Sequence, residues 1–458
     1  MRRVLDAMRD ELFASADPAA RRLAPSLAAV TFDMPFQVSG IGDRNYRGAA
    51  LVVDAERGLA ITDRNTVPVP LGDARLTFAG AVEIPARVVY VHPLHNLVVL
   101  QYDPALLRGT EVRSATLDAA PLREGEQVDV VGIDAGGEFR SRATTVAGLD
   151  PLQLPLSRSV SFRDSNLVVA TLLNGPEDIA GVLADRQGRV RGLWASFAFD
   201  NGRETAQQNR AMAAALLGET LELARGAGTL HSLEAEFGLQ TLAAARALGL
   251  PESWMARLAQ HDATGHRVLG VVRLVGGTPA ATLLQPGDIL LAVDGQPVTR
   301  FDEVERAVAG KGEVRVQVWR SDGEHAIDVP TVALDGRNIS RVLQWAGATL
   351  QEPPREISAQ RGIEPSGVYV AYFAYGSPAN RYGLLPGRRI VEVDGQPTGD
   401  LDAFLRAVAG RPDRASLRLR TLSLAGVPEL ITLELDRHYW PTFELRRQAD
   451  GWQRTALE

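Results

Sequence analysis

Residues 278–310 contain, in order, the elements Thr278-Pro279-Ala280, Pro286-Gly287-Asp288-Ile289, Val293-Asp294-Gly295-Gln296-Pro297 and Ala307-Val308-Ala309-Gly310. The same elements return in residues 377–410, as Ser377-Pro378-Ala379, Pro386-Gly387-Arg388-Arg389-Ile390, Val393-Asp394-Gly395-Gln396-Pro397 and Ala407-Val408-Ala409-Gly410. A repeat of this length and order indicates a duplicated domain. The sequence therefore predicts two copies of one domain in its second half.

Each element of the repeat has a physical role. Ser/Thr-Pro-Ala starts a short helix, Pro-Gly forms a turn, and the apolar run that follows is typical of a buried strand. Asp-Gly makes a tight hairpin, and the stretch that ends in Ala-Val is an amphipathic helix. This combination resembles the PDZ domain in its bacterial HtrA arrangement, twice over. The resemblance implies that a copy binds a peptide, often a C-terminal one, by adding it as a strand between one strand and one helix.

The loop that would receive a peptide carboxylate lies upstream of each repeat. Leu269-Gly270-Val271 is typical of such a loop, but it lies too close to Thr278 and corresponds to Gly367-Val368-Tyr369-Val370 in the second copy. We therefore expect a core strand there. The loop is placed instead at residues 232–237, before a short helix at 241–250, and at residues 345–350, before a helix at 356–363.

The two loops differ at one position. Glu234 stands in the first copy where Gly347 stands in the second, and it adds negative charge where a carboxylate would sit. We expect weak or no C-terminal peptide binding at Leu233, Glu234 and Ala235. The predicted peptide site is in the second copy, at Trp345, Ala346, Gly347, Ala348, Leu350, Phe404 and Ala407. The alternative is that both domains only pack against the rest of the chain or against another subunit.

Residues 47–67 and 88–102 are predicted to form buried strands joined by polar turns, with a corner at His92-Pro93-Leu94-His95-Asn96. These segments resemble the first barrel of the HtrA/Deg family of trypsin-like serine proteases. The resemblance implies that Asn65 stands at the position of the catalytic His and Asn96 at that of the Asp. The family's Gly-Asn-Ser-Gly-Gly-Pro-Leu signature matches residues 176–183, which implies that Ile179 stands at the nucleophile.

These three residues cannot carry out acyl transfer. Asn has no basic site near neutral pH and Ile has no nucleophilic atom, whereas a serine nucleophile needs an imidazole that a buried carboxylate orients. Other candidates, to which we assign turn, strand or cap roles, are His92, His95, Ser161, Ser165 and Ser196. No Gly-x-Ser-Gly occurs in the chain, and we expect His95 to hold a backbone carbonyl. The barrels are thus predicted to be non-catalytic; the alternative is a working serine endopeptidase with a different triad.

The predicted fold class is mostly β with some α. The chain is expected to divide into an N-terminal helix at 1–25, a degenerate trypsin-like double β-barrel at 26–203, a linker helix at 204–227, PDZ domains at 228–335 and 338–440, and a C-terminal tail at 441–458. The first helix places Val4, Met8, Leu12 and Phe13 on one face.

Composition excludes several classes of function. A net charge of −7 argues against nucleic-acid binding, and the absence of cysteine excludes disulfides and thiolate chemistry. No apolar run is long enough to cross a membrane. The charged start lacks the apolar core of a signal peptide, so we expect a cytoplasmic protein, or a periplasmic one if the true start lies upstream. No metal or cofactor is expected.

Residues 76–96 and His438-Tyr439-Trp440-Pro441-Thr442-Phe443 look like the degenerate second half of double-length HtrA/Deg proteins. The resemblance implies that the barrels serve in assembly, as a homotrimer by family analogy, and that the PDZ domains recruit C-terminal or unfolded peptide segments. An active HtrA-type protease, as a missing half or a separate chain, would then do the cutting in protein quality control.

Overall fold

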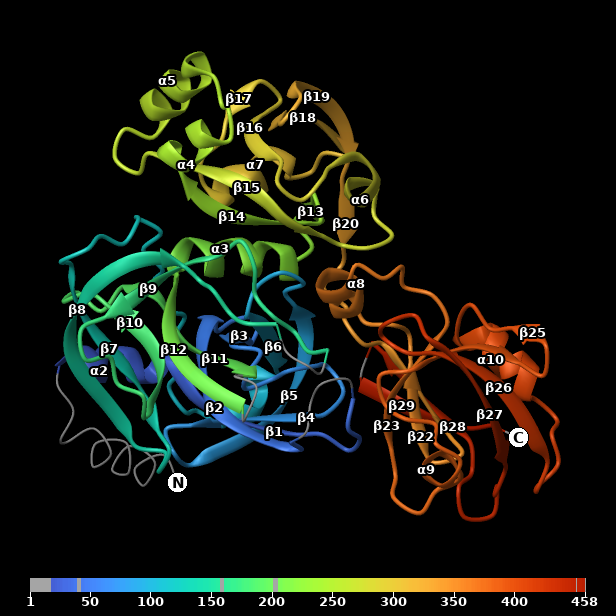
Figure 1. Ribbon diagram of the computed structural model, residues 1–458. Helices are drawn as coiled ribbons and strands as arrows, with labels where there is room; N and C mark the ends of the chain where they lie inside the picture. Colours follow the sequence, from blue (N-terminus) through green and yellow to red (C-terminus); the bar gives the residue numbers. More distant parts are fainter. Residues whose placement is uncertain (1–17, 39–42, 157–159, 201–204, 450, 458) are drawn as a thin grey trace.

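The structure of the chain is a computed structural model that describes residues 18–38, 43–156, 160–200, 205–449 and 451–457. Two closed six-stranded barrels are followed by a helix and two further β domains (Figure 1). The predicted fold class, a trypsin-like double barrel before two PDZ domains, is confirmed. Most of the N-terminal helix predicted for 1–25, with Val4, Met8, Leu12 and Phe13, lies outside the described residues. These begin with α2 (Pro18–Leu23) and a 3-10 turn (Ala24–Ser26).

The first barrel closes around alternate side chains of its strands. In β1, Ala28, Val30 and Phe32 face the barrel interior, while Leu27 faces the second barrel. The order around the barrel is β1-β2-β3-β6-β5-β4. The strands are β1 (Leu27–Asp33), β2 (Asn45–Asp54), β3 (Leu59–Thr62), β4 (Asp73–Phe78), β5 (Val82–Val91) and β6 (Val98–Tyr102), followed by a 3-10 turn (Pro104–Leu107).

The second barrel has the order β10-β11-β12-β9-β8-β7. Its strands are β7 (Gln127–Asp134), β8 (Phe139–Pro151), β9 (Val168–Leu172), β10 (Ile179–Ala184), β11 (Val190–Asp200) and β12 (Thr205–Ala213). The helix predicted from residue 204 begins only at α3 (Ala214–Ala224), because β12 pairs along its whole length with β11. This pairing overrides the local helical pattern. The barrel region therefore extends to Ala213 rather than ending at residue 203.

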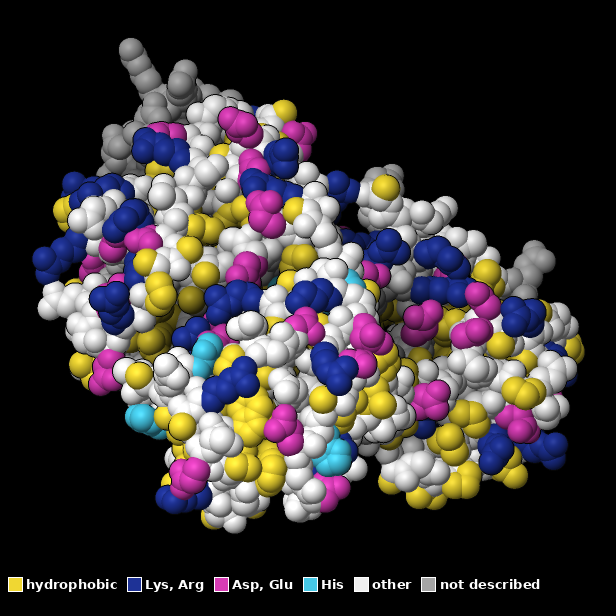
Figure 2. Space-filling model, turned by 90° about the horizontal axis from the view of Figure 1, so that it is seen from above, with side chains coloured by type: hydrophobic (Ala, Val, Ile, Leu, Met, Phe, Trp, Pro, Cys, Tyr) yellow, Lys and Arg dark blue, Asp and Glu magenta, His cyan; other side chains and the backbone are white. Residues whose placement is uncertain are grey.

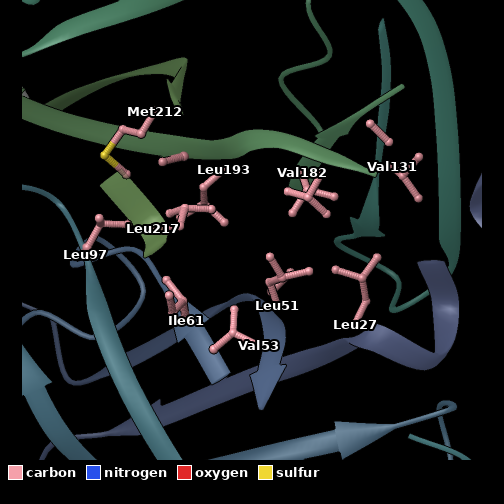
Figure 3. Close-up of a cluster of buried hydrophobic side chains, with 14 of the residues drawn as sticks. Leu27, Leu51, Val53, Ile61, Leu97, Val131, Val182, Leu193, Met212 and Leu217 are labelled. Carbon is pink, nitrogen blue, oxygen red and sulfur yellow. The ribbon is translucent and has the colours of Figure 1, made fainter. Parts of the chain in front are cut away.

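The two barrels share a core where they meet. Figure 3 shows Leu27, Leu51 and Ile61 of the first barrel pointing toward Val182 and Leu193 of the second. Met212 and Leu217, from the end of β12 and from α3, join the same cluster. This shared core holds the barrels together and positions the loops at their junction.

The first PDZ domain forms a sheet in the order β14-β15-β16-β18-β19, and β14 is its edge strand. The predicted core strand at Leu269-Gly270-Val271 is confirmed as part of β15. The elements are β13 (Leu230–Ser232), β14 (Ala235–Thr241), α4 (Leu242–Ala247), α5 (Glu252–His261), β15 (Arg267–Leu274), α6 (Pro279–Leu283), β16 (Ile289–Val293), β17 (Gln296–Pro297), α7 (Phe301–Val308), β18 (Glu313–Arg320), β19 (Gly323–Pro330) and β20 (Val332–Leu334).

The second PDZ domain repeats this arrangement. Its hairpin at Asp394-Gly395 has positive φ at both residues, as has Asp294-Gly295 in the first copy. The elements are β21 (Arg341–Trp345), β22 (Ala348–Gln351), α8 (Arg355–Arg361), β23 (Val368–Phe373), α9 (Pro378–Arg381), β24 (Arg389–Val393), β25 (Gln396–Pro397), α10 (Leu401–Val408), β26 (Ser416–Leu422) and β27 (Pro428–Glu434).

The segment predicted as a C-terminal tail is part of the second PDZ sheet. Strands β28 (Phe443–Gln448) and β29 (Gly451–Ala456) form a hairpin, and β28 pairs with β21. The sheet order is β27-β26-β24-β23-β22-β21-β28-β29. Val342 of β21 and Leu445 of β28 enter the hydrophobic core of the first barrel. The second PDZ domain is thereby packed against that barrel.

The parts of the chain lie close together. Helix α3 lies between the barrels and the first PDZ domain, and α8 lies near the junction of the two PDZ domains (Figure 1). On the face shown in Figure 2, acidic and basic side chains are intermixed without a large patch of one sign. In the described part of the chain, no helix is long and apolar enough to cross a membrane.

Candidate functional site

A cavity of about 680 Å³ lies between the barrels and the second PDZ domain. Asn65, Asn96 and Ser196 line it on the barrel side, and Gln351 and Glu356 line it on the side of the second PDZ domain. Asn65 follows β3, Asn96 precedes β6, and Ser196 lies within β11, so strands of both barrels position this site.

The structure brings two of the three predicted triad positions together at Ser196. The Asn65 side-chain amide donates to Ser196 Oγ at 3.0 Å, and the Asn96 amide donates to the Ser196 carbonyl oxygen at 2.7 Å. Asn96 Oδ1 accepts the Arg64 backbone N–H at 2.6 Å. Both amides are therefore fixed, and neither can remove the Ser196 proton. Sequence reasoning had placed Ser196 only beside the third motif, not at the centre of this network.

Ile179 lies elsewhere. It is the first residue of β10, 3% exposed, and it packs in the core of the second barrel with Trp194 and Leu183. It does not line the cavity. The structure thus joins Asn65 to Asn96 but does not join Ile179 to them.

The two corner histidines are buried, and neither of them lines the cavity. His92 Nδ1 accepts the backbone N–H groups of Leu94 and His95 at 3.2 and 3.0 Å, and burial lowers its pKa well below the usual range. His95 Nε2 lies 3.0 Å from Glu305 Oε1 on α7. Burial is the largest single effect and lowers the pKa of His95, but the carboxylates of Glu305, Asp164 and Glu219 together outweigh it and the net pKa is raised.

The expectation that His95 holds a backbone carbonyl is wrong, since its partner is a carboxylate. The first PDZ domain packs against this corner and supplies Glu305, and no local sequence signal reports a contact 210 residues away.

Three buried charges, Asp63, Arg64 and Asp164, surround the asparagine pair. Asp63 Oδ2 accepts the Ser196 backbone N–H at 3.0 Å. Asp164 Oδ1 accepts the Asn96 backbone N–H at 2.8 Å, and burial raises the pKa of Asp164 to about 6. The Arg64 guanidinium lies 3.7 Å from Glu356 of α8 and 3.5 Å from the centre of the Phe162 ring. Burial lowers the pKa of Arg64 to about 10. Sequence reasoning missed Asp164 and Arg64, because no motif marks them.

In the first PDZ domain, the loop residue Glu234 is held by an arginine. Glu234 is 2% exposed, has a φ of 54°, and binds Arg355 of α8 through both carboxylate oxygens at 2.8 Å. Its neighbours Leu233 and Ala235 are also buried. The negative charge predicted for this loop is therefore neutralised by the second PDZ domain.

The outer edge of β14 is capped by one side chain of the second barrel. Asn166 Nδ2 donates to the carbonyl oxygen of Ala235, and Asn166 Oδ1 accepts the N–H of Phe237, both at 2.8 Å. Asn166 has a φ of 56°, a conformation that asparagine tolerates better than most residues. A single amide thus satisfies a donor and an acceptor that an added strand would use.

In the second PDZ domain, the predicted peptide site is filled. Six of its residues belong to the buried core of the domain, namely Trp345, Ala346, Ala348, Leu350, Phe404 and Ala407, and Gly347 lies in the turn between β21 and β22. Strand β21 pairs along β22, which is the strand that a peptide would join. Peptide binding at this site stays a prediction, and it requires β21 to leave.

Comparisons with known proteins agree with this architecture. A PDZ domain model matches residues 270–320, and a PDZ-like domain model matches residues 338–414. The chain is 32% identical to Protease Do-like 7 of Arabidopsis thaliana, over 98% of this chain and 45% of that protein. It is 32% identical to the pro-apoptotic serine protease nma111 of Aspergillus clavatus, over 93% of this chain and 43% of that protein.

A third relative is the PDZ domain-containing protein C23G3.12c of Schizosaccharomyces pombe, which is 31% identical over 93% of this chain and 43% of its own length. The chain spans less than half the length of these relatives. A solved structure titled HtrA-type protease AlgW with tripeptide covers 69% of this chain and 96% of its own, with a TM-score of 0.49 and 19% identity. By its barrels, its two PDZ domains and these relatives, the chain is a protease-like protein of the HtrA/Deg family.

Proposed function

We propose that this chain is a non-catalytic member of the family, a pseudoprotease that binds peptide segments and assembles with a protease partner. One observation carries the proposal. At the junction of the barrels, Ser196 is hydrogen-bonded by two amides, those of Asn65 and Asn96, where an active protease needs an imidazole and a carboxylate. A serine hydroxyl without a base to take its proton is a weak nucleophile.

The histidines support the same proposal. All seven histidines of the chain lie in the described ranges, and none of them lines the cavity. His92 Nδ1 accepts backbone N–H groups, and His95 is paired with Glu305. Neither ring can therefore act on Ser196 or Ser161, the serines predicted near the third motif that line the cavity.

Peptide recognition is the second part of the proposal. A PDZ domain binds by strand addition, and β14 is an edge strand whose outer groups meet a side chain rather than a strand. The proposed partners are C-terminal or unfolded peptide segments, together with an active HtrA-type protease that acts on them in protein quality control. The matched relatives are longer than this chain by more than twofold, so that protease is either a missing half or another subunit. A homotrimer through the barrels is proposed by family analogy alone.

A fluorophosphonate probe tests the loss of catalysis. The folded chain is incubated with the probe beside an active serine protease as a positive control, and labelling is measured by mass spectrometry. We expect no stoichiometric adduct on the chain. Labelling of wild type that disappears in Ser196→Ala or Ser161→Ala would overturn the proposal and favour an endopeptidase with a non-standard catalytic set.

A further inference from the structure

Strand β21 lies on the edge of β22 that a PDZ ligand would occupy. Its residues Leu343, Gln344 and Trp345 are opposite Leu350, Thr349 and Ala348 in antiparallel register. The equivalent strand of the first copy, β13, pairs with β20 instead and leaves β14 as an edge. The second copy therefore carries a strand in its groove that the first copy does not.

The side chains of β21 fill the space between β22 and α10. Leu343 and Trp345 are 1% and 2% exposed and share a core with Leu401, Phe404 and Ala407 of α10. The Trp345 and Phe404 rings meet edge-on with centres 5.1 Å apart. A PDZ ligand lies between one strand and one helix and places alternate side chains in pockets. Leu343 and Trp345 have this placement and this spacing.

The turn that follows β21 is tight and packs against the segment that leads into α9. Ala346 and Gly347 have φ values of 50° and 77° and close a two-residue hairpin. Their carbonyl oxygens accept the N–H groups of Ala379 and Ala374 at 3.0 and 2.8 Å. A Cβ at Gly347 would lie 2.1 Å from Ser377 Cβ, so this corner is packed tightly. The groove as it stands holds an internal segment, not a chain end.

The opposite face of β21 is anchored outside the domain. Val342 is fully buried in the core of the first barrel beside Leu445, and β28 pairs with the outer edge of β21. The same strand therefore fills the groove with one face and holds the second PDZ domain on the barrel with the other.

We propose that β21 is a tethered ligand of the second PDZ groove. The groove takes an extended internal segment with large apolar side chains at alternate positions, holds residues 341–345 in cis, and admits a second segment of that kind only after β21 leaves. This inference goes beyond the loss of catalysis, because a tethered ligand in the second PDZ groove is compatible with either an active or an inactive barrel.

A reversible lock on β21 tests the proposal. Gln344 and Thr349 are opposite each other, with Gln344 Nε2 donating to Thr349 Oγ1 at 2.8 Å, and the chain has no cysteine. In the full chain, Gln344→Cys and Thr349→Cys are combined with Trp345→Ala, which weakens the tethered segment. Binding of the acetylated and amidated peptide RVLQW is then measured by fluorescence anisotropy with the disulfide reduced and oxidised. The matched control peptide, RVQLW, places Leu and Trp on opposite faces of the strand.

The reduced variant is expected to bind RVLQW, and oxidation is expected to weaken that binding by about 100-fold, because a tethered strand competes at millimolar effective concentration. RVQLW is expected to bind at least about 10-fold more weakly, because its Gln would enter the apolar pocket that Leu343 fills. Three outcomes would each overturn the proposal: equal affinity for RVLQW with the disulfide reduced and oxidised, equal affinity for the two peptides, or no binding of RVLQW to the folded reduced variant.

Hydrogen exchange on wild type keeps the proposal falsifiable if the variant does not fold. A tethered ligand leaves without unfolding its domain, so the Leu343 and Leu350 amides are expected to exchange through a partial opening. The Val370 and Leu419 amides, on β23 and β26, should stay protected during that opening. Exchange of all four amides in one global step would make β21 an ordinary core strand and overturn the inference.

Discussion

The first PDZ domain and the second present the same strand to their surroundings and close its edge in different ways. Both strands carry a bulge at the same point, before Phe237 in β14 and before Leu350 in β22. The edge of β22 is covered by the strand β21, whereas the edge of β14 is capped by the side chain of Asn166 from the barrel. Duplication preserved the fold of the domain but not the occupant of its binding edge.

The loops that precede these two strands also differ in what they contact. Gly347 forms half of a tight turn within its own domain, whereas Glu234 at the corresponding place reaches out to Arg355 of the neighbouring domain. The second copy is closed by its own chain segment and the first by contacts with other domains. The first copy is therefore the one whose edge can be opened by changing a single contact.

The largest expected effect comes from Trp345→Ala. Removing this fully buried ring leaves a cavity against Phe404, and we expect a loss of about 3–5 kcal/mol in the free energy of unfolding, measured by urea denaturation. The corresponding residue of the first copy is Ser232, which has no ring to fill a groove. Its hydroxyl oxygen accepts the Glu234 backbone N–H. Ser232→Ala should cost about 1 kcal/mol. Equal losses in the two variants would contradict the difference between the grooves.

Arg355→Ala should cost about 3 kcal/mol, because it leaves the Glu234 carboxylate buried without its partner. The matched control is Arg246→Ala, which breaks the exposed pair with Glu252 and should change stability by less than about 1 kcal/mol. Thermal denaturation of both variants provides the measurement. A loss no larger than that of the control would mean that Glu234 does not depend on the second domain.

The sequence predicts the fold far better than it predicts which residues cover the edges of β14 and β22. The repeat predicts both PDZ domains because turns, caps and strand periods are local. The barrel segments predict that Asn65 and Asn96 belong to one site, but they place Ile179 there and not Ser196. The strand β12 was predicted as helix because Met212 and the leucines after it have helical spacing, while the pairing with β11 that decides the matter is not local. The pairing of β21 with β28 joins residues about 100 positions apart, so Trp345 was predicted in a loop and residues 441–458 as a tail.

The contact of the first copy with the barrel should depend on pH. His95 faces Glu305, Glu219, Asp164 and the ring of His92; burial lowers its pKa, the carboxylates raise it, and the net pKa is raised. The folded state thus holds this proton more tightly than the unfolded state does. The stabilisation is complete below the unfolded pKa of about 6.5 and is lost as pH rises through the folded pKa.

Urea denaturation between pH 5 and 9 measures this effect against His95→Gln, which cannot titrate. We expect the stability advantage of wild type over the variant to fall as the pH rises across the range. His95 lowers the pKa of Asp164, so the titration of Asp164 also differs between the two proteins and forms part of the measured difference. A constant difference across the range would show that the His95 to Glu305 pair is not charged.

The most direct test of the comparison between the two edges is amide hydrogen exchange in Asn166→Gly, read at Phe237 and Leu350 in one sample. Glycine accepts the φ of 56° at this position, so only the amide cap is lost, and Asn174→Gly, at a φ of 52° on the surface, is the control. We expect the Phe237 amide to exchange at least about 10-fold faster in Asn166→Gly, while Leu350 and the Asn174→Gly protein stay unchanged. An unchanged Phe237 amide, or equal acceleration at Leu350, would contradict the claim that a side chain closes one edge and a strand the other.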